Sequence, residues 1–403
     1  MGIILRSFKS SNEDYITLPV IRTFVKKYNI QCSSIHNRNS LIEQIEIFGS
    51  QSQENKEIVL SWVDNIIAEG IKDVHLYYMQ LDDSFKISIL NETERNKFLK
   101  SFNMEKPYIC SNTYGKEYSF VNANYTENSY GPKLKFILCR KLVTHDTKSI
   151  TKTIDYPVIV EYYLKSNWLK ISAKPKSNLY LYEGPDFSLE NAKKTTSDKE
   201  IKIVKGIITK NLKFKTSETR QKTLEIKNKI FNLIDKYTKT PEEIESLIRF
   251  NDDKIKIISD ELSQMCDVSE SSKDDVIEDL TNLIEKYMSI NWRDKDVFTK
   301  DRDAYSIKLS ATDEEESKVE QTAALHDPLQ TKAIFFDNKK MLYKNRMCEG
   351  VTFMWKRNSK QSFTNEYFTV IISSDKEGKC VFKFREYTSM EDIENVLFSI
   401  INS

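Results

Sequence analysis

Apolar residues in the first 70 positions recur at the spacing of buried helix faces. One such stripe precedes Gly49, and another covers residues 18–28, where Pro19 suits the first turn of a helix. The clearest stripe ends before Gly70, a residue suited to a helix C-terminus, and consists of Val59, Trp62, Val63, Ile66 and Ile67. We therefore predict a helical module over residues 1–72.

From residue 73 the apolar pattern changes to runs rich in β-branched and aromatic residues, which are typical of strands. These runs cover residues 75–81, 85–90, 134–141, 156–163, 168–173 and 179–182. In the fifth run, Leu169 and Ile171 alternate with Trp168 and Lys170, which predicts one apolar and one solvent-exposed sheet face. Residues 165–167 fit a hairpin turn. We predict an antiparallel, β-rich basic domain over residues 73–215.

The second half of the chain returns to helices and ends in a mixed region. Thr240 and Pro241 indicate a helix start, and Ser272 opens a second helix whose apolar stripe we expect to face a core. That stripe consists of Val276, Leu280, Leu283, Ile284 and Tyr287. Strands are expected at residues 333–336, 351–355, 367–372 and 380–384, before a closing helix that Ser389 caps. The fold class is therefore α+β, with an acidic helical region over 216–300 and a C-terminal α/β domain over 301–403.

Composition excludes several kinds of site. Only 9 of 403 residues are glycine, and neither a P-loop nor a dinucleotide-binding glycine pattern occurs. The six cysteines are too far apart for zinc-knuckle spacing, so we expect reduced thiols, no metal and a cytoplasmic protein. Without 18 consecutive apolar residues, no membrane span is predicted. The cysteines are Cys32, Cys110, Cys139, Cys266, Cys348 and Cys380.

Catalytic motifs are also lacking. The four histidines show neither the spacing of a metal-binding helix nor a paired arrangement, and no nucleophile elbow is present. His145 and His326 both precede an aspartate and fit turns. These observations favour a protein without catalytic activity and without a cofactor.

Charge is strongly segregated although the net charge is only +1. Residues 133–229 contain 22 Lys and Arg against 10 Asp and Glu, whereas residues 242–316 contain 10 against 22. A third stretch, residues 332–385, has 12 basic and 5 acidic residues. A basic surface attracts polyanions and an acidic one repels them, so the first and third stretches favour a nucleic-acid partner.

Aromatic side chains accompany the lysines of the predicted sheet, as in surfaces that hold single-stranded nucleic acid by stacking and phosphate contacts. The candidate nucleic-acid-binding residues are Lys135, Lys141, Trp168, Lys170, Lys174, Lys176 and Tyr180. Two other readings remain open. Tyr and Trp are good strand formers and lysines protect exposed sheet faces, or the two charged regions neutralise each other within or between subunits.

One arrangement suggests an enzyme instead. Pro185-Asp186 follows a predicted strand, and Glu200-Ile201-Lys202 opens the run 201–208, which looks like another strand. This order resembles the P-D…(D/E)-x-K site of the restriction-endonuclease-like nucleases. The resemblance implies that Asp186 and Glu200 hold magnesium while Lys202 activates water. The resemblance covers about 20 residues. The other reading of the first part is a structural Asp in a Gly-Pro-Asp turn.

The combined pattern predicts a non-catalytic subunit of a multiprotein complex, associated with nucleic acid or acting as a scaffold. DNA or RNA, partner proteins and a second copy of the chain are the candidate partners. Its Lys-, Ile- and Asn-rich texture is similar to that of accessory proteins in prokaryotic antiviral defence loci. The alternatives are the magnesium-dependent nuclease and a purely protein–protein assembly component.

Overall fold

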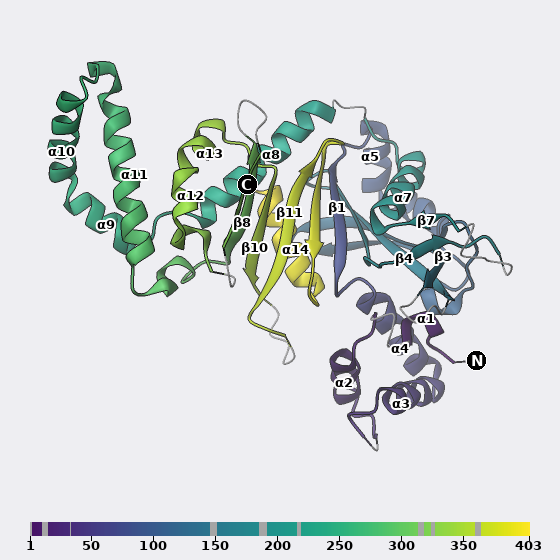
Figure 1. The fold of residues 1–403 in the computed structure, drawn as a ribbon. Helices are drawn as coiled ribbons and strands as arrows, with labels where there is room; N and C mark the ends of the chain where they lie inside the picture. Colours follow the sequence, from purple (N-terminus) through teal and green to yellow (C-terminus); the bar gives the residue numbers. More distant parts are fainter. Residues whose placement is uncertain are drawn as a thin grey trace. The chain divides into compact units, whose positions relative to one another are not determined.

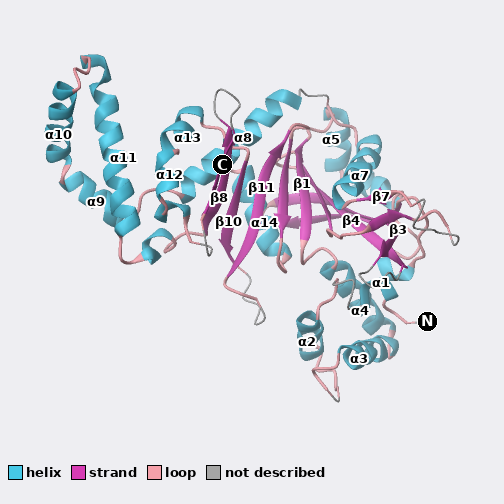
Figure 2. Cartoon of the chain, in the orientation of Figure 1, coloured by secondary structure: helices cyan, strands magenta, loops and turns pink. Residues whose placement is uncertain are grey.

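The computed structural model describes residues 2–9, 15–32, 34–145, 151–184, 192–215, 219–312, 318–323, 327–358 and 364–403. Helices account for 47% of the structure and strands for 24% (Figures 1 and 2). The strands pair in antiparallel fashion, which confirms the α+β class. The chain forms two compact units, described separately below. Unit 1 comprises Met1–Glu218, Ser359–Thr364 and Val381–Glu394, and unit 2 comprises Thr219–Asn358, Asn365–Cys380 and Asn395–Ser403.

Unit 1 is built on an antiparallel sheet. Its strands are β1 (Lys72–Tyr78), β2 (Ser119–Asn128), β3 (Gly131–His145), β4 (Thr151–Tyr163), β5 (Trp168–Ala173), β6 (Leu179–Leu181) and β7 (Lys194–Thr195). The order is β7-β6-β3-β4-β5-β1, and β2 also pairs with β3. Asn167, with φ +58°, ends the turn between β4 and β5, which confirms the predicted hairpin.

Seven helices accompany this sheet in the described part of unit 1. They are α1 (Arg6–Lys9), α2 (Leu18–Lys27), α3 (Arg38–Ser50), α4 (Gln53–Ile66), α5 (Asp83–Leu90), α6 (Glu92–Lys100) and α7 (Ser197–Asn211), with a short 3-10 helix at Ile109–Ser111. The three predicted N-terminal helices are confirmed as α2, α3 and α4. The strands predicted at 85–90 and 201–208 are wrong, because these residues belong to the helices α5 and α7. The side-chain oxygens of Asp82 and Thr196 cap these helices by accepting hydrogen bonds from backbone N–H groups of the first turn.

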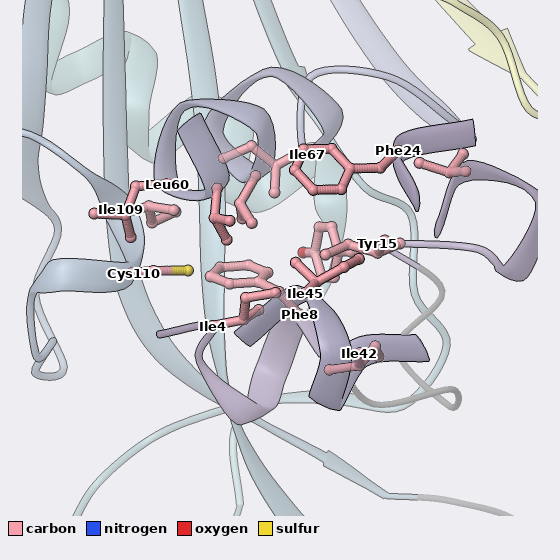
Figure 3. Close-up of a cluster of buried hydrophobic side chains, with 14 of the residues drawn as sticks. Ile4, Phe8, Tyr15, Phe24, Ile42, Ile45, Leu60, Ile67, Ile109 and Cys110 are labelled. Carbon is pink, nitrogen blue, oxygen red and sulfur yellow. The ribbon is translucent and has the colours of Figure 1, made fainter. Parts of the chain in front are cut away.

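Both faces of the sheet in unit 1 are covered by apolar cores. Residues from α1 to α4 contribute to one apolar cluster, part of which is drawn in Figure 3. The same cluster includes Ile137, Cys139 and Ile159 from one face of the sheet. The other face packs Leu169 and Ile171 against α7 and neighbouring segments. All six residues of β5 are buried. The prediction of one solvent-exposed face is therefore wrong at the central strands: a period of two gives the side to which a residue points, not what covers that side.

Unit 2 contains a second group of antiparallel strands, β8 (Ala304–Thr312), β9 (Lys318–Thr322), β10 (Gly350–Lys356) and β11 (Tyr367–Asp375), in the order β11-β10-β8-β9. Helix α8 (Thr219–Tyr237) contacts β8, β10 and β11. The strand predicted at 333–336 is wrong, since these residues begin α12 (Ala333–Asp337), which precedes α13 (Lys339–Asn345). Strand β12 (Lys379–Phe384) and helix α14 (Met390–Ile401) are each divided between the two units.

The remaining helices of unit 2 form an arm of α9 (Glu242–Phe250), α10 (Asp252–Met265) and α11 (Lys273–Asn291), in which α10 packs along α11 (Figure 1). Helix α11 begins after Ser272, as predicted. Its apolar stripe was expected to face a core, but Leu283 and Tyr287 are exposed, which corrects that expectation. The buried side of α11 carries Glu285 and Ser289 instead. Short 3-10 helices lie at Glu270–Ser272, Lys295–Phe298 and Leu329–Thr331.

Among the described residues, the structure contains no helix that is both long enough and apolar enough to cross a membrane.

Candidate nucleic-acid interface

Three of the predicted nucleic-acid-binding residues lie inside the protein. Trp168 is 5% exposed, Lys170 1% and Lys174 7%, so the expectation that they form a solvent-facing surface is wrong. Trp168 and Lys170 do share one side of β5, as the alternation predicted, but that side is covered, and Lys174 directly follows the strand. Nucleic acid cannot reach these three side chains without displacing other elements of unit 1.

The buried lysines are held by a carboxylate on the neighbouring strand. Glu161 lies opposite Lys170 in the β4–β5 register, and its oxygens are 2.6 Å from the Nζ of Lys170 and 2.7 Å from that of Lys133. Lys133 also pairs with Glu394. Burial alone would raise the pKa of Glu161, but Lys170 and Lys133 hold it well below its usual range. These lysines therefore neutralise a buried acid.

Two further lysines surround a tyrosine ring. The Nζ of Lys174 lies 5.0 Å and that of Lys72 lies 5.9 Å from the centre of the Tyr15 ring, within the range of cation–π attraction. Lys72 also donates a 2.5 Å hydrogen bond to the carbonyl oxygen of Ile67. Burial, with Lys174 and Lys170 nearby, lowers the pKa of Lys72 to about 7. Of these two lysines, Lys174 belongs to the basic stretch, and its side chain is part of the protein interior.

The other predicted binding residues, Lys135, Lys141, Lys176 and Tyr180, are half-buried. Lys141 and Tyr180 belong to the edge formed by β3, β6 and β7, where Tyr180 lies opposite Lys194. Lys141 lies 6.0 Å from the centre of the Tyr182 ring. The aromatic and basic character predicted for the sheet is thus accessible at this edge.

The residues of the nuclease-like pattern do not converge among the described segments. Glu200 is fully buried on α7, where Arg140 donates hydrogen bonds of 2.8 Å and 2.6 Å to its two oxygens and Tyr118 donates one of 2.8 Å. Lys202 is exposed, and two residues along a helix place it far around the axis from Glu200. Asp186 lies outside the described residues. The carboxylate of Glu200 is occupied by a buried ion pair.

The part of the chain that the structure describes contains no group of three or more His, Cys, Asp or Glu side chains able to hold a metal ion. His75, for example, is buried with its Nε2 3.2 Å from Asp198 and its Nδ1 3.1 Å from the hydroxyl of Tyr77. Every nitrogen of this ring therefore has a protein neighbour.

An exposed row of lysines on α7 was missed by the sequence reasoning. Ile201, Val204 and Ile208 are buried against the sheet, and they leave the opposite side of the helix to solvent. That side carries Lys199, Lys202, Gly206 and Lys210, which are all exposed. We call these four residues the α7 row. The i, i+3, i+7 spacing of the buried residues and the capping Thr196 were the available signals for a helix.

Charge around the α7 row is strongly positive. Residues 192–215 contain eight lysines and two acidic residues, Asp198 and Glu200. Glu200 is neutralised by Arg140, and Asp198 lies 3.6 Å from Lys202 and 3.2 Å from His75. From Lys199 to Lys210 the row extends about 16 Å along the helix. It therefore presents several cations on one rigid, sheet-backed element.

Comparisons with known proteins give no match, whether the chain is compared with family models, with curated proteins or with solved structures.

Proposed function

We propose that the chain is a non-catalytic, nucleic-acid-associated subunit that contacts the phosphate backbone through the α7 row. The observation that carries this proposal is the helical row of exposed lysines opposite the buried Ile201, Val204 and Ile208. Lysines on a fixed element bind phosphates as point charges and release counterions, without reading base sequence. The β3–β6–β7 edge, with Tyr180 and Lys141, offers an aromatic surface for stacking.

Gly206 gives this proposal additional support. It lies within α7, faces solvent, and a Cβ added there would meet nothing within 4 Å. Glycine in the interior of a helix makes the helix less stable than alanine would, by about 1 kcal/mol. The absence of a side chain at this point of the α7 row lets a phosphate backbone approach the helix closely.

The test replaces the three lysines of the row with glutamine, as Lys199→Gln, Lys202→Gln and Lys210→Gln together. A labelled single-stranded oligonucleotide is titrated by fluorescence anisotropy over a range of salt concentrations. The slope of log K against log salt should fall in magnitude by about 2, because each lost single-strand contact contributes roughly 0.7. Affinity at low salt should fall by about 10- to 100-fold.

The matched control replaces Lys97, Lys100 and Lys106, which are exposed elsewhere in unit 1, with glutamine. It removes the same charge and should leave the slope nearly unchanged. If both triple variants weaken binding equally, or if the unmodified protein does not bind at low salt, the α7 row is not a nucleic-acid interface.

We extend the proposal to a reducing, cytoplasmic setting, which the six free cysteines support. That the chain acts together with partner proteins is part of the same proposal. A role in antiviral defence remains a prediction that rests on composition.

A second candidate function, protein assembly, is favoured by the arm of unit 2. Phe250 is 84% and Met265 79% exposed, and the arm also exposes Leu247, Ile257, Ile258, Leu283 and Tyr287. Several exposed apolar residues in one region of a protein are typical of interaction surfaces. We infer that this acidic arm binds a protein, either a partner with a basic, apolar surface or another copy of the chain.

Light scattering after size exclusion tests the self-association form of this candidate. The double variant Phe250→Ser/Met265→Ser should convert an oligomer to a monomer. Ile87→Ser/Leu90→Ser alters two exposed apolar residues on α5 and should not change the mass. A monomeric unmodified protein would remove the self-association form and leave only the hetero-complex.

A further inference from the structure

The N-terminal helices of unit 1 line an open pocket of about 610 Å³ that the functions proposed above do not use. Its walls come from α2, from α4 and from the residues Glu69, Tyr108 and Tyr387. The pocket lies beside the apolar core of Figure 3, to which Phe24 belongs. It is large enough for a side chain or a small organic molecule.

Aromatic rings form much of the wall. The ring of Phe24 is centred 4.3 Å from that of Trp62 and 4.6 Å from that of Tyr28, in tilted arrangements. Tyr108 and Tyr387 add two rings from outside the helices. Phe24 is buried, whereas the other four are partly exposed. The pocket is thus lined by four partly exposed aromatic rings and by the buried ring of Phe24.

Charged side chains on the wall are mainly acidic. Glu54 and Glu57 on α4 are exposed, and Glu69 is half-buried, where it accepts a hydrogen bond from the hydroxyl of Tyr387. Burial raises the pKa of Glu69. Among the described residues that line the pocket, Lys27 is the one basic side chain, and its Nζ lies 5.3 Å from the centre of the Tyr28 ring. Three carboxylates and one ammonium give the wall a formal charge of −2 when all are ionised.

We propose that this pocket binds an organic cation, an alkylammonium or guanidinium group. Among aromatic side chains, the ring face of Trp attracts a cation most strongly, and Trp62 supplies such a ring. The carboxylates of Glu54 and Glu57 would neutralise the positive charge of the bound ligand. An anionic ligand such as a nucleotide would meet three acidic side chains, so this pocket is unsuited to the polyanion proposed for the α7 row. The wall already holds one cation over a ring, the Lys27 ammonium over Tyr28.

The cation has two possible sources, a free polyamine or a basic side chain of a partner protein. Isothermal titration calorimetry on the full chain distinguishes them with spermidine, with a short Gly-Ser peptide that carries one arginine, and with the same peptide carrying neutral citrulline. Tighter binding of the arginine peptide than of spermidine indicates a protein ligand, and the reverse order indicates a free amine. The citrulline peptide, which carries no positive charge on its side chain, should bind much more weakly than the arginine peptide.

Two pocket variants and one control test the site. Trp62→Leu should weaken binding by about tenfold, because it removes the strongest ring face. Glu57→Gln should also weaken binding, and it leaves the packing intact because its side chain is exposed. Glu43→Gln neutralises an exposed acid on α3 outside the pocket and should leave binding unchanged.

The proposal fails if none of the cations binds, if the citrulline peptide binds as well as the arginine peptide, or if Glu43→Gln weakens binding as much as Glu57→Gln. None of these outcomes affects the α7 row, because that row lies on a different element and is tested with nucleic acid.

Discussion

The lysines of the sheet and those of α7 belong to the same basic stretch of sequence but have opposite surroundings. Lys133 and Lys170 are buried and pair with Glu161, whereas Lys199 and Lys210 extend into solvent. A local excess of positive charge therefore combines charges that stabilise the fold with charges that are accessible to a partner. Only the second kind can contribute to a binding surface.

The covering of each element explains the difference. A central strand of unit 1 has apolar material on both faces, so a charged side chain there must find a buried partner, as Lys170 does with Glu161. Helix α7 buries only the side that carries Ile201, Val204 and Ile208, and its other side remains in water. Lysine therefore requires a counter-charge in the first region and none in the second.

The largest expected effect follows from removing the acid that the sheet lysines share. Glu161→Gln leaves Lys170 without its carboxylate partner and should lower the free energy of unfolding by about 3–5 kcal/mol, measured by urea denaturation at pH 7. The charge loss on α7, in Lys199→Gln, should change it by less than about 0.5 kcal/mol. Equal effects of the two substitutions would remove the distinction between the regions.

The acidity of Glu161 adds a pH signature to this prediction. Because its pKa is lowered in the folded protein, its stabilising contribution is present above the ordinary glutamate pKa of 4.5 and decreases at lower pH. The stability difference between Glu161→Gln and the unmodified protein should therefore be constant near neutrality and narrow in acid. A difference that widens as the pH falls would contradict the ion-pair assignment.

A smaller effect is expected at a buried acid whose pKa is raised by burial more than it is lowered by its neighbours. Asp64 in α4 accepts a 3.1 Å hydrogen bond from the backbone N–H of Ile109, and burial raises its pKa to about 7. The folded state therefore binds a proton that the unfolded state releases, and stability falls as the pH rises from about 4 to 7. Asp64→Asn should stabilise the protein by about 1–3 kcal/mol at pH 8.5.

This gain should shrink as the pH falls toward 5, because the carboxyl of the unmodified protein is then neutral as well. Thermal melts of both proteins between pH 5 and 8.5 provide the measurement. A gain independent of pH would show that the hydrogen bond, not the ionisation of Asp64, determines the difference.

Sequence periodicity was sufficient for elements whose local pattern and packing agree. The N-terminal helices, the strands β3 to β6 and the turn at Asn167 all appear where the apolar spacing placed them. The pattern misled at residues 201–208, where Ile201, Lys202 and Ile203 alternate like a strand although Thr196 caps a helix. The capping residue lies outside this short run of sequence, and it is a better indicator of the secondary structure than three alternating positions within the run.

Burial was harder to predict than secondary structure. The sequence placed Trp168 and Lys170 on the same side of β5, as the structure has them. The charged groups buried beside Lys170, which include Lys133 and Glu394, come from distant parts of the chain. The exposed stripe of α11 shows the opposite error, because Leu283 and Tyr287 have the spacing of a core face without a core against them. Local spacing defines a face, whereas tertiary contacts determine its environment.

The smallest effect concerns Gly206, where folding and the proposed binding make opposite demands. Gly206→Ala should raise the free energy of unfolding by about 0.5–1 kcal/mol, because alanine favours the helix and its Cβ meets no neighbour. If phosphate approaches the α7 row closely, the same methyl group should weaken oligonucleotide binding severalfold while the salt slope stays the same, since no charge is lost. Greater stability with unchanged affinity would leave the lysines as the binding groups but remove close approach as the reason for a glycine at this position.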